Sequence, residues 1–288
     1  MEVYLYLLNQ IKKRTMVLIL STFIFVPYEV ATAGAWTQKK GGGYYKVSFR
    51  YLGGDKIYNS DGEKDPIPKF TDITIGLFGS YGLTENLTTF LNVGLFKSTK
   101  LDSSSQDFGS ETDVSGFGDI VVGLKYGLFK IDKTVISAKL IFGIPTGLST
   151  PDGGLWIGDG NANQLVGIEA GHSFWPSKFY LTEGIAFNNQ TNGFSDQFLY
   201  YIEGGYRFSK NFLLIARLHG IVSFENGDPN VKGGFGTYEN NRQYIAYNAE
   251  LVYSISSNWG VSAYYESGTK GKNIISAPVY NFGVFFTH

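Results

Sequence analysis

The chain contains no cysteine and only three histidines and two methionines among its 288 residues. Without cysteine it can form no disulfide, thiolate metal site, cysteine nucleophile or lipidated N-terminal cysteine. It has no strong excess of either charge, with 25 acidic against 24 basic side chains, so nothing predicts a nucleic-acid partner. It also has no Walker-type phosphate loop. The sequence therefore predicts no cofactor and no nucleotide-driven activity.

The few histidines also argue against an enzyme. His172 stands next to Ser173, but adjacent residues of one strand point to opposite sides and cannot form a nucleophile–base pair. Asp159, Asn161 and Asn163 imitate the start of a calcium loop, yet Ala170 occupies the position that requires a bidentate glutamate. We predict no catalytic site and no metal site, apart from a weak loop-bound cation that this pattern leaves open.

Only one long apolar run is present, and it lies near the N-terminus. The run Met16–Val26 follows the basic cluster Lys12–Arg14 and precedes the small residues Ala31–Ala33. This layout predicts a cleavable secretory signal over residues 1–33, since eleven residues are too few to span a bilayer as a helix. A membrane anchor is the alternative. The absence of any later apolar stretch of about 18 residues predicts no transmembrane helix in residues 34–288.

What the chain has in abundance is glycine (37 residues), tyrosine (20) and phenylalanine (23), arranged in alternating segments. In 119–128, for example, Ile120, Val122 and Leu124 point one way, and Asp119 and Lys125 point the other. Twelve such segments occur, at 43–52, 70–82, 87–97, 117–129, 134–145, 162–173, 178–188, 196–208, 212–225, 241–255, 258–267 and 275–286.

Alternation alone fits either a soluble sandwich or a membrane barrel, but segment length and spacing favour the barrel. Most segments run longer than the roughly 5–6 residues typical of globular strands and fit a tilted membrane crossing. Short connections (82–86, 130–133, 174–177, 209–211, 256–257) alternate with long ones (53–69, 98–116, 146–161, 226–240). We therefore predict an all-β fold, an up-and-down antiparallel transmembrane barrel of about twelve strands over residues 34–288, in the bacterial outer membrane.

Several details of this barrel follow from the same pattern. In 178–188, Glu183 shares a face with phenylalanine and leucine side chains, which predicts a bulge or a buried pair there. An aromatic girdle is predicted at the membrane interfaces from Trp175, Tyr180, Tyr206, Tyr253 and Trp259.

The predicted partners follow from location. The last segment carries Tyr280, Phe282, Val284 and Phe286 on one face and is similar to the C-terminal strands that the barrel assembly machinery reads. Outer-membrane lipid surrounds the barrel. The acidic residues of the long connections solvate the extracellular side or contact lipopolysaccharide through divalent cations: Asp61, Glu63, Asp65, Asp102, Asp107, Glu111 and Asp113.

Three stretches carry a family resemblance: GFGDIVVGLKYGLF (116–129), IFGIPTG (141–147) and GDGNANQLVGIEAGHSF (158–174). They resemble the outer-membrane family named for the meta-pathway of phenol degradation, which is grouped loosely with the long-chain fatty-acid and aromatic-hydrocarbon transporter barrels. The resemblance implies a channel that admits small, often hydrophobic molecules. The fatty-acid transporters carry an N-terminal hatch, whereas here Gly34–Gly42 is too short to plug a lumen, so no hatch-dependent cycle is expected.

The charged faces of the segments predict the lumen lining: Lys46, Arg50, Asp119, Lys125, Lys139, Glu169, Glu203, Arg207, Arg217, Arg242, Glu250 and Glu266. These residues form either a selectivity lining or a lattice of ion pairs that fills a small barrel. If Phe208 and Phe212 face each other across their turn, Glu203 lies opposite Arg217 and pairs with it. The leading hypothesis is a passive channel for small hydrophobic or aromatic molecules; the competing one is a non-conducting structural or surface-interaction barrel.

Overall fold

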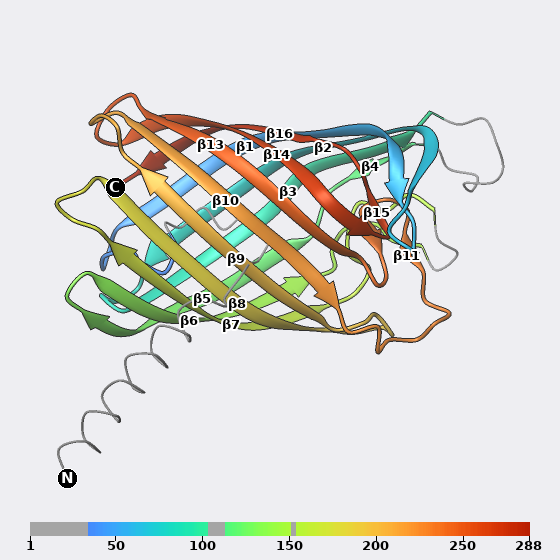
Figure 1. Cartoon of the computed structure of the whole chain (residues 1–288), viewed down its shortest axis with the longest axis horizontal. Coiled ribbons are helices and arrows are strands. Elements are labelled where there is room, and N and C mark those ends of the chain that lie inside the picture. The colour runs from blue at the N-terminus through green and yellow to red at the C-terminus, as the bar shows by residue number, and fades with distance from the viewer. Residues whose placement is uncertain (1–33, 103–112, 151–153) are drawn as a thin grey trace, which may run out of the picture.

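A computed structural model describes residues 34–102, 113–150 and 154–288 of the chain (Figure 1). The predicted signal at residues 1–33, and the acidic loop residues Asp107 and Glu111, lie outside the described residues, so these predictions stay untested. Within the described ranges no helix is long and apolar enough to cross a membrane.

Twelve long strands form one closed antiparallel sheet, and the predicted twelve-strand barrel is confirmed. Each strand pairs with its neighbours along the chain, and β1 closes the barrel by pairing with both β2 and β16. The strands are β1 (Gly43–Tyr58), β2 (Lys64–Gly82), β3 (Leu87–Leu101), β5 (Ile120–Ile131), β6 (Thr134–Ile144), β7 (Asn163–Ser173), β8 (Phe179–Gln190), β9 (Gln197–Tyr206), β10 (Phe212–Ser223), β13 (Gln243–Ser254), β14 (Trp259–Lys272) and β16 (Val279–Thr287). They run obliquely to the barrel axis in Figure 1.

Short strands gather at one end of the barrel. They are β4 (Asp113–Gly116), which pairs with β3, β15 (Ile274–Ile275), which pairs with β1, and the hairpin of β11 (Gly233–Gly234) with β12 (Tyr238–Glu239). The predicted long connection at 53–69 is instead mostly strand, because β1 and β2 continue to Tyr58 and Lys64 past a bulge near Gly54. The Gly53–Gly54 pair had hidden this continuation, since glycine carries no alternation signal.

The opposite end of the barrel carries the tight turns, the start of β1 and the end of β16. Gly43 and His288 hydrogen-bond each other there, at 3.1 Å in both directions. In outer-membrane barrels the tight turns lie on the periplasmic side. The short strands and long connections therefore lie at the extracellular end.

The outer surface of the barrel is apolar. Val47, Phe49, Tyr280 and Phe282 are each about half exposed, and similar side chains stand outward on the other long strands. In a soluble sandwich these side chains would pack into a core; here they surround a closed sheet and face outward, as lipid contact requires.

The girdle residues lie mainly where the alternation places them. Trp175, Tyr206, Tyr253 and Trp259 are exposed at the periplasmic end of the outer surface. Tyr180 is the exception, because it points inward and donates a hydrogen bond to the lumenal Glu203 at 2.9 Å. The prediction for Tyr180 was wrong, since its neighbours Phe179 and Leu181 hold the outward positions.

The predicted bulge at Glu183 is also wrong. The pairing of β8 with β7 and β9 continues without a shift, and Glu183 stands on the outward face opposite Ala170 and Ile202. A carboxylate facing lipid away from the interfaces costs free energy, although less than a basic side chain does.

We therefore expect Glu183→Leu to raise the free energy of unfolding in lipid vesicles by about 1–2 kcal/mol. Urea titration of the refolded barrel, followed by tryptophan fluorescence, measures the change. Glu183→Gln serves as the control, because it removes the charge and keeps the shape. A loss of stability in Glu183→Leu would show that the carboxyl makes a favourable contact on the outer surface.

Candidate functional site

The candidate site is the interior of the barrel, which four elements divide along its axis. From the periplasmic end they are the N-terminal segment (Gly34–Gly42), a layer of ion pairs, a belt of apolar side chains and a chamber beneath the extracellular connections.

The N-terminal segment enters the lumen. The carbonyl oxygen of Gly34 accepts a hydrogen bond from the Lys125 ammonium, and Ala35 is buried. The Trp36 ring packs edge-on against Tyr180 at a centroid distance of 5.8 Å, and the Gln38 N–H donates to Thr88 Oγ1 at 2.8 Å. Lys125, Tyr180 and Thr88 all line the interior.

This segment, which its length predicts to be too short to plug the lumen, nevertheless lies inside it. Nine residues in extended form reach roughly 30 Å, enough to cross the interior of a small barrel. Part of that interior is already filled by side chains, so a strap suffices where a wider barrel would need a folded hatch.

The ion-pair layer lies directly beyond this segment. Glu169 pairs with Lys125 at 3.0 Å and with Lys139 at 2.7 Å, and it accepts a hydrogen bond from Tyr201. All three charged side chains are at most 5% exposed. Two ammonium groups thus share one carboxylate in a site closed to solvent.

The predicted pair of Glu203 and Arg217 is confirmed. The two residues are direct partners across β9 and β10, and Arg217 Nε lies 3.0 Å from Glu203 Oε2. Phe208 and Phe212 stack across the turn at 5.5 Å, as the predicted register requires.

The apolar belt follows toward the extracellular side. Each long strand from β2 to β10 contributes at least one buried apolar side chain to it: Phe78, Phe90, Val121, Ile141, Leu165, Ala186, Leu199, Tyr201 and Ile221. β13, β14, β16 and β1 add polar groups such as Asn248, Ser262, Asn281 and Ser48, and Tyr44 and Tyr244 of these strands pack against the belt. The buried apolar side chains of the belt are thus concentrated on β2 to β10.

The extracellular connections fold inward and form what we call the cap. Leu155 and Ile157 from the β6–β7 connection and Phe235 from the β11–β12 hairpin pack with Phe70 and Leu101 of the wall. The Phe235 N–H donates a backbone hydrogen bond to the Gly154 carbonyl at 2.8 Å and joins the two connections.

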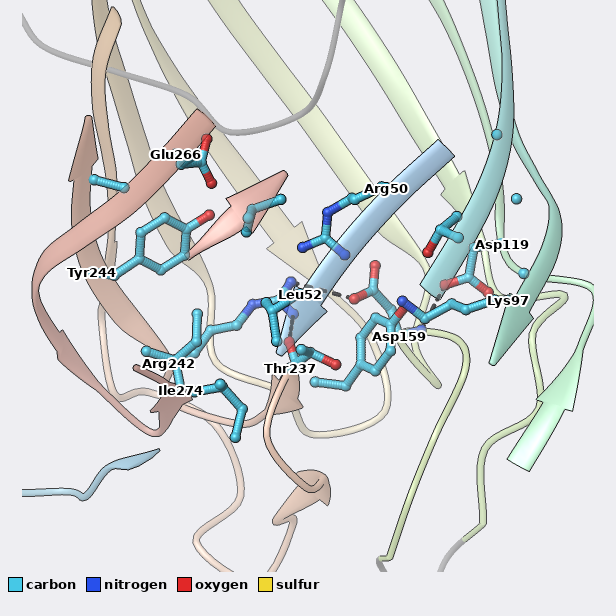
Figure 2. Close-up of a pocket in the computed structure, with 18 of the residues that line it drawn as sticks. Arg50, Leu52, Lys97, Asp119, Asp159, Thr237, Arg242, Tyr244, Glu266 and Ile274 are labelled. Atoms are coloured by element: carbon cyan, nitrogen blue, oxygen red, sulfur yellow. Dashed lines mark hydrogen bonds and ion pairs between the residues drawn. The ribbon is translucent and has the colours of Figure 1, made fainter. Parts of the chain in front are cut away.

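Between the belt and the cap lies a chamber of about 350 Å³ (Figure 2). Phe78, Val121 and Ile221 of the belt contribute to its lining. Its charged lining comes from Lys46, Arg50, Lys97, Asp119, Asp159, Arg242, Glu266 and Lys270.

Three ion pairs hold the chamber wall. Asp72 is fully buried and pairs with Arg50 at 2.9 Å and with Lys97 at 2.7 Å. Arg242 pairs with Asp159 at 3.3 Å. Lower in the barrel, Lys46 pairs with Glu250 at 3.2 Å.

The structure brings most of the predicted lining residues inside the barrel. Glu266 lies 3.0 Å from His219, and Asp119 accepts hydrogen bonds from the backbone N–H groups of Gly147 and Asp159. Arg207 is the exception: β9 ends at Tyr206, so Arg207 lies exposed in the periplasmic turn.

Sequence reasoning missed Asp72 and Lys97. The outward Ile73 and Ile75 could have assigned Asp72 to the lumen. Lys97 was hidden by the register shift between β2 and β3, in which Leu95 is the extra residue and reverses the alternation. Within the described residues, no group of three or more His, Asp or Glu side chains could hold a metal ion.

No protein-family model and no curated protein sequence matches the chain. Solved structures do match. The COG4313 outer membrane channel from Pseudomonas putida F1 superposes with a TM-score of 0.70 at 13% identity, covering 90% of this chain and 100% of that one. The NanC porin superposes with a TM-score of 0.51 at 8% identity, covering 83% and 98%.

At these identities the similarity concerns the fold. A closed twelve-strand barrel with an apolar outer surface, sharing the fold of outer-membrane channels and porins, defines the class: the chain is a bacterial outer-membrane β-barrel.

Proposed function

We propose that this protein is a channel that lets small molecules cross the outer membrane down their concentration gradient, and that the structure represents its closed form. The chamber carries this proposal. A purely structural barrel gains packing energy when side chains fill its interior. Here a space of about 350 Å³ remains between the apolar belt and the cap.

The N-terminal segment and the cap, which lie toward opposite ends of the lumen, support the proposal. The N-terminal segment contacts the wall mainly through single hydrogen bonds and ring contacts, and the cap is built from connections, so both can move without breaking the sheet. Loops and chain ends are the parts of a fold with the lowest local stability.

The apolar belt favours hydrophobic or aromatic solutes as cargo, in agreement with the resemblance of Gly116–Phe129 and Gly158–Phe174 to the meta-pathway family. We therefore also propose that the chain belongs to that family, that its cargo is hydrophobic or aromatic, and that it has no enzymatic activity. The competing function, a non-conducting barrel, is favoured by the ion pairs that fill the periplasmic half.

Planar-bilayer recording of the refolded mature barrel distinguishes the two. We expect mostly closed traces with brief, discrete openings, because two elements must move before ions pass. Liposomes containing the protein should swell faster in phenol-sized solutes than in disaccharides. Traces without any opening, together with swelling equal to that of protein-free liposomes, would exclude a channel.

A further inference from the structure

We propose that the chamber binds a small organic anion, a carboxylate attached to a planar apolar body such as an aromatic ring. This inference rests on the proposed function, because it names the class of cargo that pauses between the belt and the cap. Three features of the chamber lead to it.

The first is the arrangement of charge around Asp72. Its two oxygens accept from Arg50, Lys97, Thr99 and Thr74, so this carboxylate is used entirely by the chain. Asp72 is 0% exposed, whereas the Arg50 side chain remains 26% exposed. Arg50 and Lys97 therefore share the Asp72 carboxylate. Asp72 lies behind the chamber wall, and the Arg50 guanidinium faces the chamber.

The second is a neighbouring guanidinium. Arg50 and Arg242 line the same chamber, and Figure 2 shows both side chains pointing into it. An anion bound in this chamber would be attracted by the positive charge of both groups. A carboxylate matches the planar fork of a guanidinium and is a natural ligand for it.

The third is the state of the other acidic groups in the lining. Asp159 accepts from Arg242 and from Asn163, Asp119 accepts two backbone N–H groups, and Glu266 accepts from Asn248 and lies against His219. These carboxylates are directed toward the chain. These contacts stabilise the wall and the cap. The Arg50 side chain, 26% exposed, is more open than those of Glu266 at 19% and Asp159 at 12%.

The remaining lining sets the size and nature of the ligand body. Phe78, Val121 and Ile221 form an apolar surface, and the volume lies at the lower end of the range of about 300–1,000 Å³ typical of small-molecule sites. A single aromatic ring with one carboxylate fits these limits.

Calorimetric titration of the mature barrel, refolded in detergent, tests the inference with three probes of nearly equal shape: benzoate, benzyl alcohol and benzylamine. We expect benzoate to bind most tightly. Arg50→Gln should weaken benzoate binding about 10- to 100-fold, the effect of one charged hydrogen bond, and should leave benzyl alcohol unchanged. Arg50→Lys should restore part of the affinity.

Lys100→Gln is the matched control, since Lys100 is an exposed cation that pairs with Asp102 outside the chamber. Arg50→Gln should still fold, because Lys97 continues to neutralise Asp72; heat-modifiable migration on gels checks this. If Arg50→Gln does not fold, Arg50→Lys decides, because it keeps the charge beside Asp72 and removes the planar fork. Weaker benzoate binding is then expected, and unchanged binding overturns the inference.

Equal affinity for benzoate and benzyl alcohol, or a preference for benzylamine, would overturn the inference as well. Bilayer conductance separates this failure from failure of the proposed function. A conducting barrel without benzoate preference loses only the inference, whereas a barrel that binds benzoate but never conducts loses only the channel.

Discussion

A barrel that begins at Gly41, without residues 34–40, should conduct several times more current than the complete mature chain and should stay open for longer. The deleted residues include Gly34, which accepts from Lys125, and Trp36, which packs against Tyr180. Their removal opens the periplasmic end of the lumen, while every strand of the barrel keeps its pairing. Planar-bilayer recording in potassium chloride measures the change.

Two single substitutions calibrate the deletion. Trp36→Ala removes the ring contact with Tyr180 and keeps the backbone, so openings should become more frequent without a change in their size. Lys40→Ala alters an exposed side chain of the same segment and should leave the traces as they are. If the deleted barrel conducted no better than the complete one, the ion-pair layer or the cap would be the element that closes the lumen.

The barrel itself could be predicted because the pattern of each strand is set by residues that are close together in the sequence. Each strand must present apolar side chains to lipid at every second position, and that period is visible in the sequence. The pairing of Glu203 with Arg217 was predictable for the same reason, since a tight turn between Phe208 and Phe212 fixes the register of both strands.

The contents of the lumen could not be predicted in this way. The N-terminal segment has no periodicity, and its position depends on contacts with Thr88 and Lys125, which lie far away in sequence. The apolar belt was hidden because an inward Val121 or Ile141 looks, in one strand, like any other apolar residue. Its members meet only once the sheet is closed, so that neighbouring strands bring them together.

The charge cluster at Glu169 should have the largest effect on stability. We expect Glu169→Gln to lower the free energy of unfolding by about 3–5 kcal/mol, because it leaves two ammonium groups in a closed site without their shared carboxylate. Lys125 and Lys139 are only 1% and 4% exposed, so water cannot replace that partner without opening the layer. Urea titration in lipid vesicles and the yield of heat-modifiable, folded protein give the measurement.

Glu203→Gln provides the matched comparison, and its effect should be smaller. It removes the carboxylate from a single cation, Arg217, whose side chain is 21% exposed and can be partly solvated. A second variant separates charge from packing: Glu169→Gln combined with Lys139→Gln leaves one ammonium group, which still contacts the Gly34 carbonyl, and should recover part of the lost stability. Equal stability of Glu169→Gln and the unmodified barrel would mean that water or ions already reach this layer, and the periplasmic half of the lumen would then be open rather than filled.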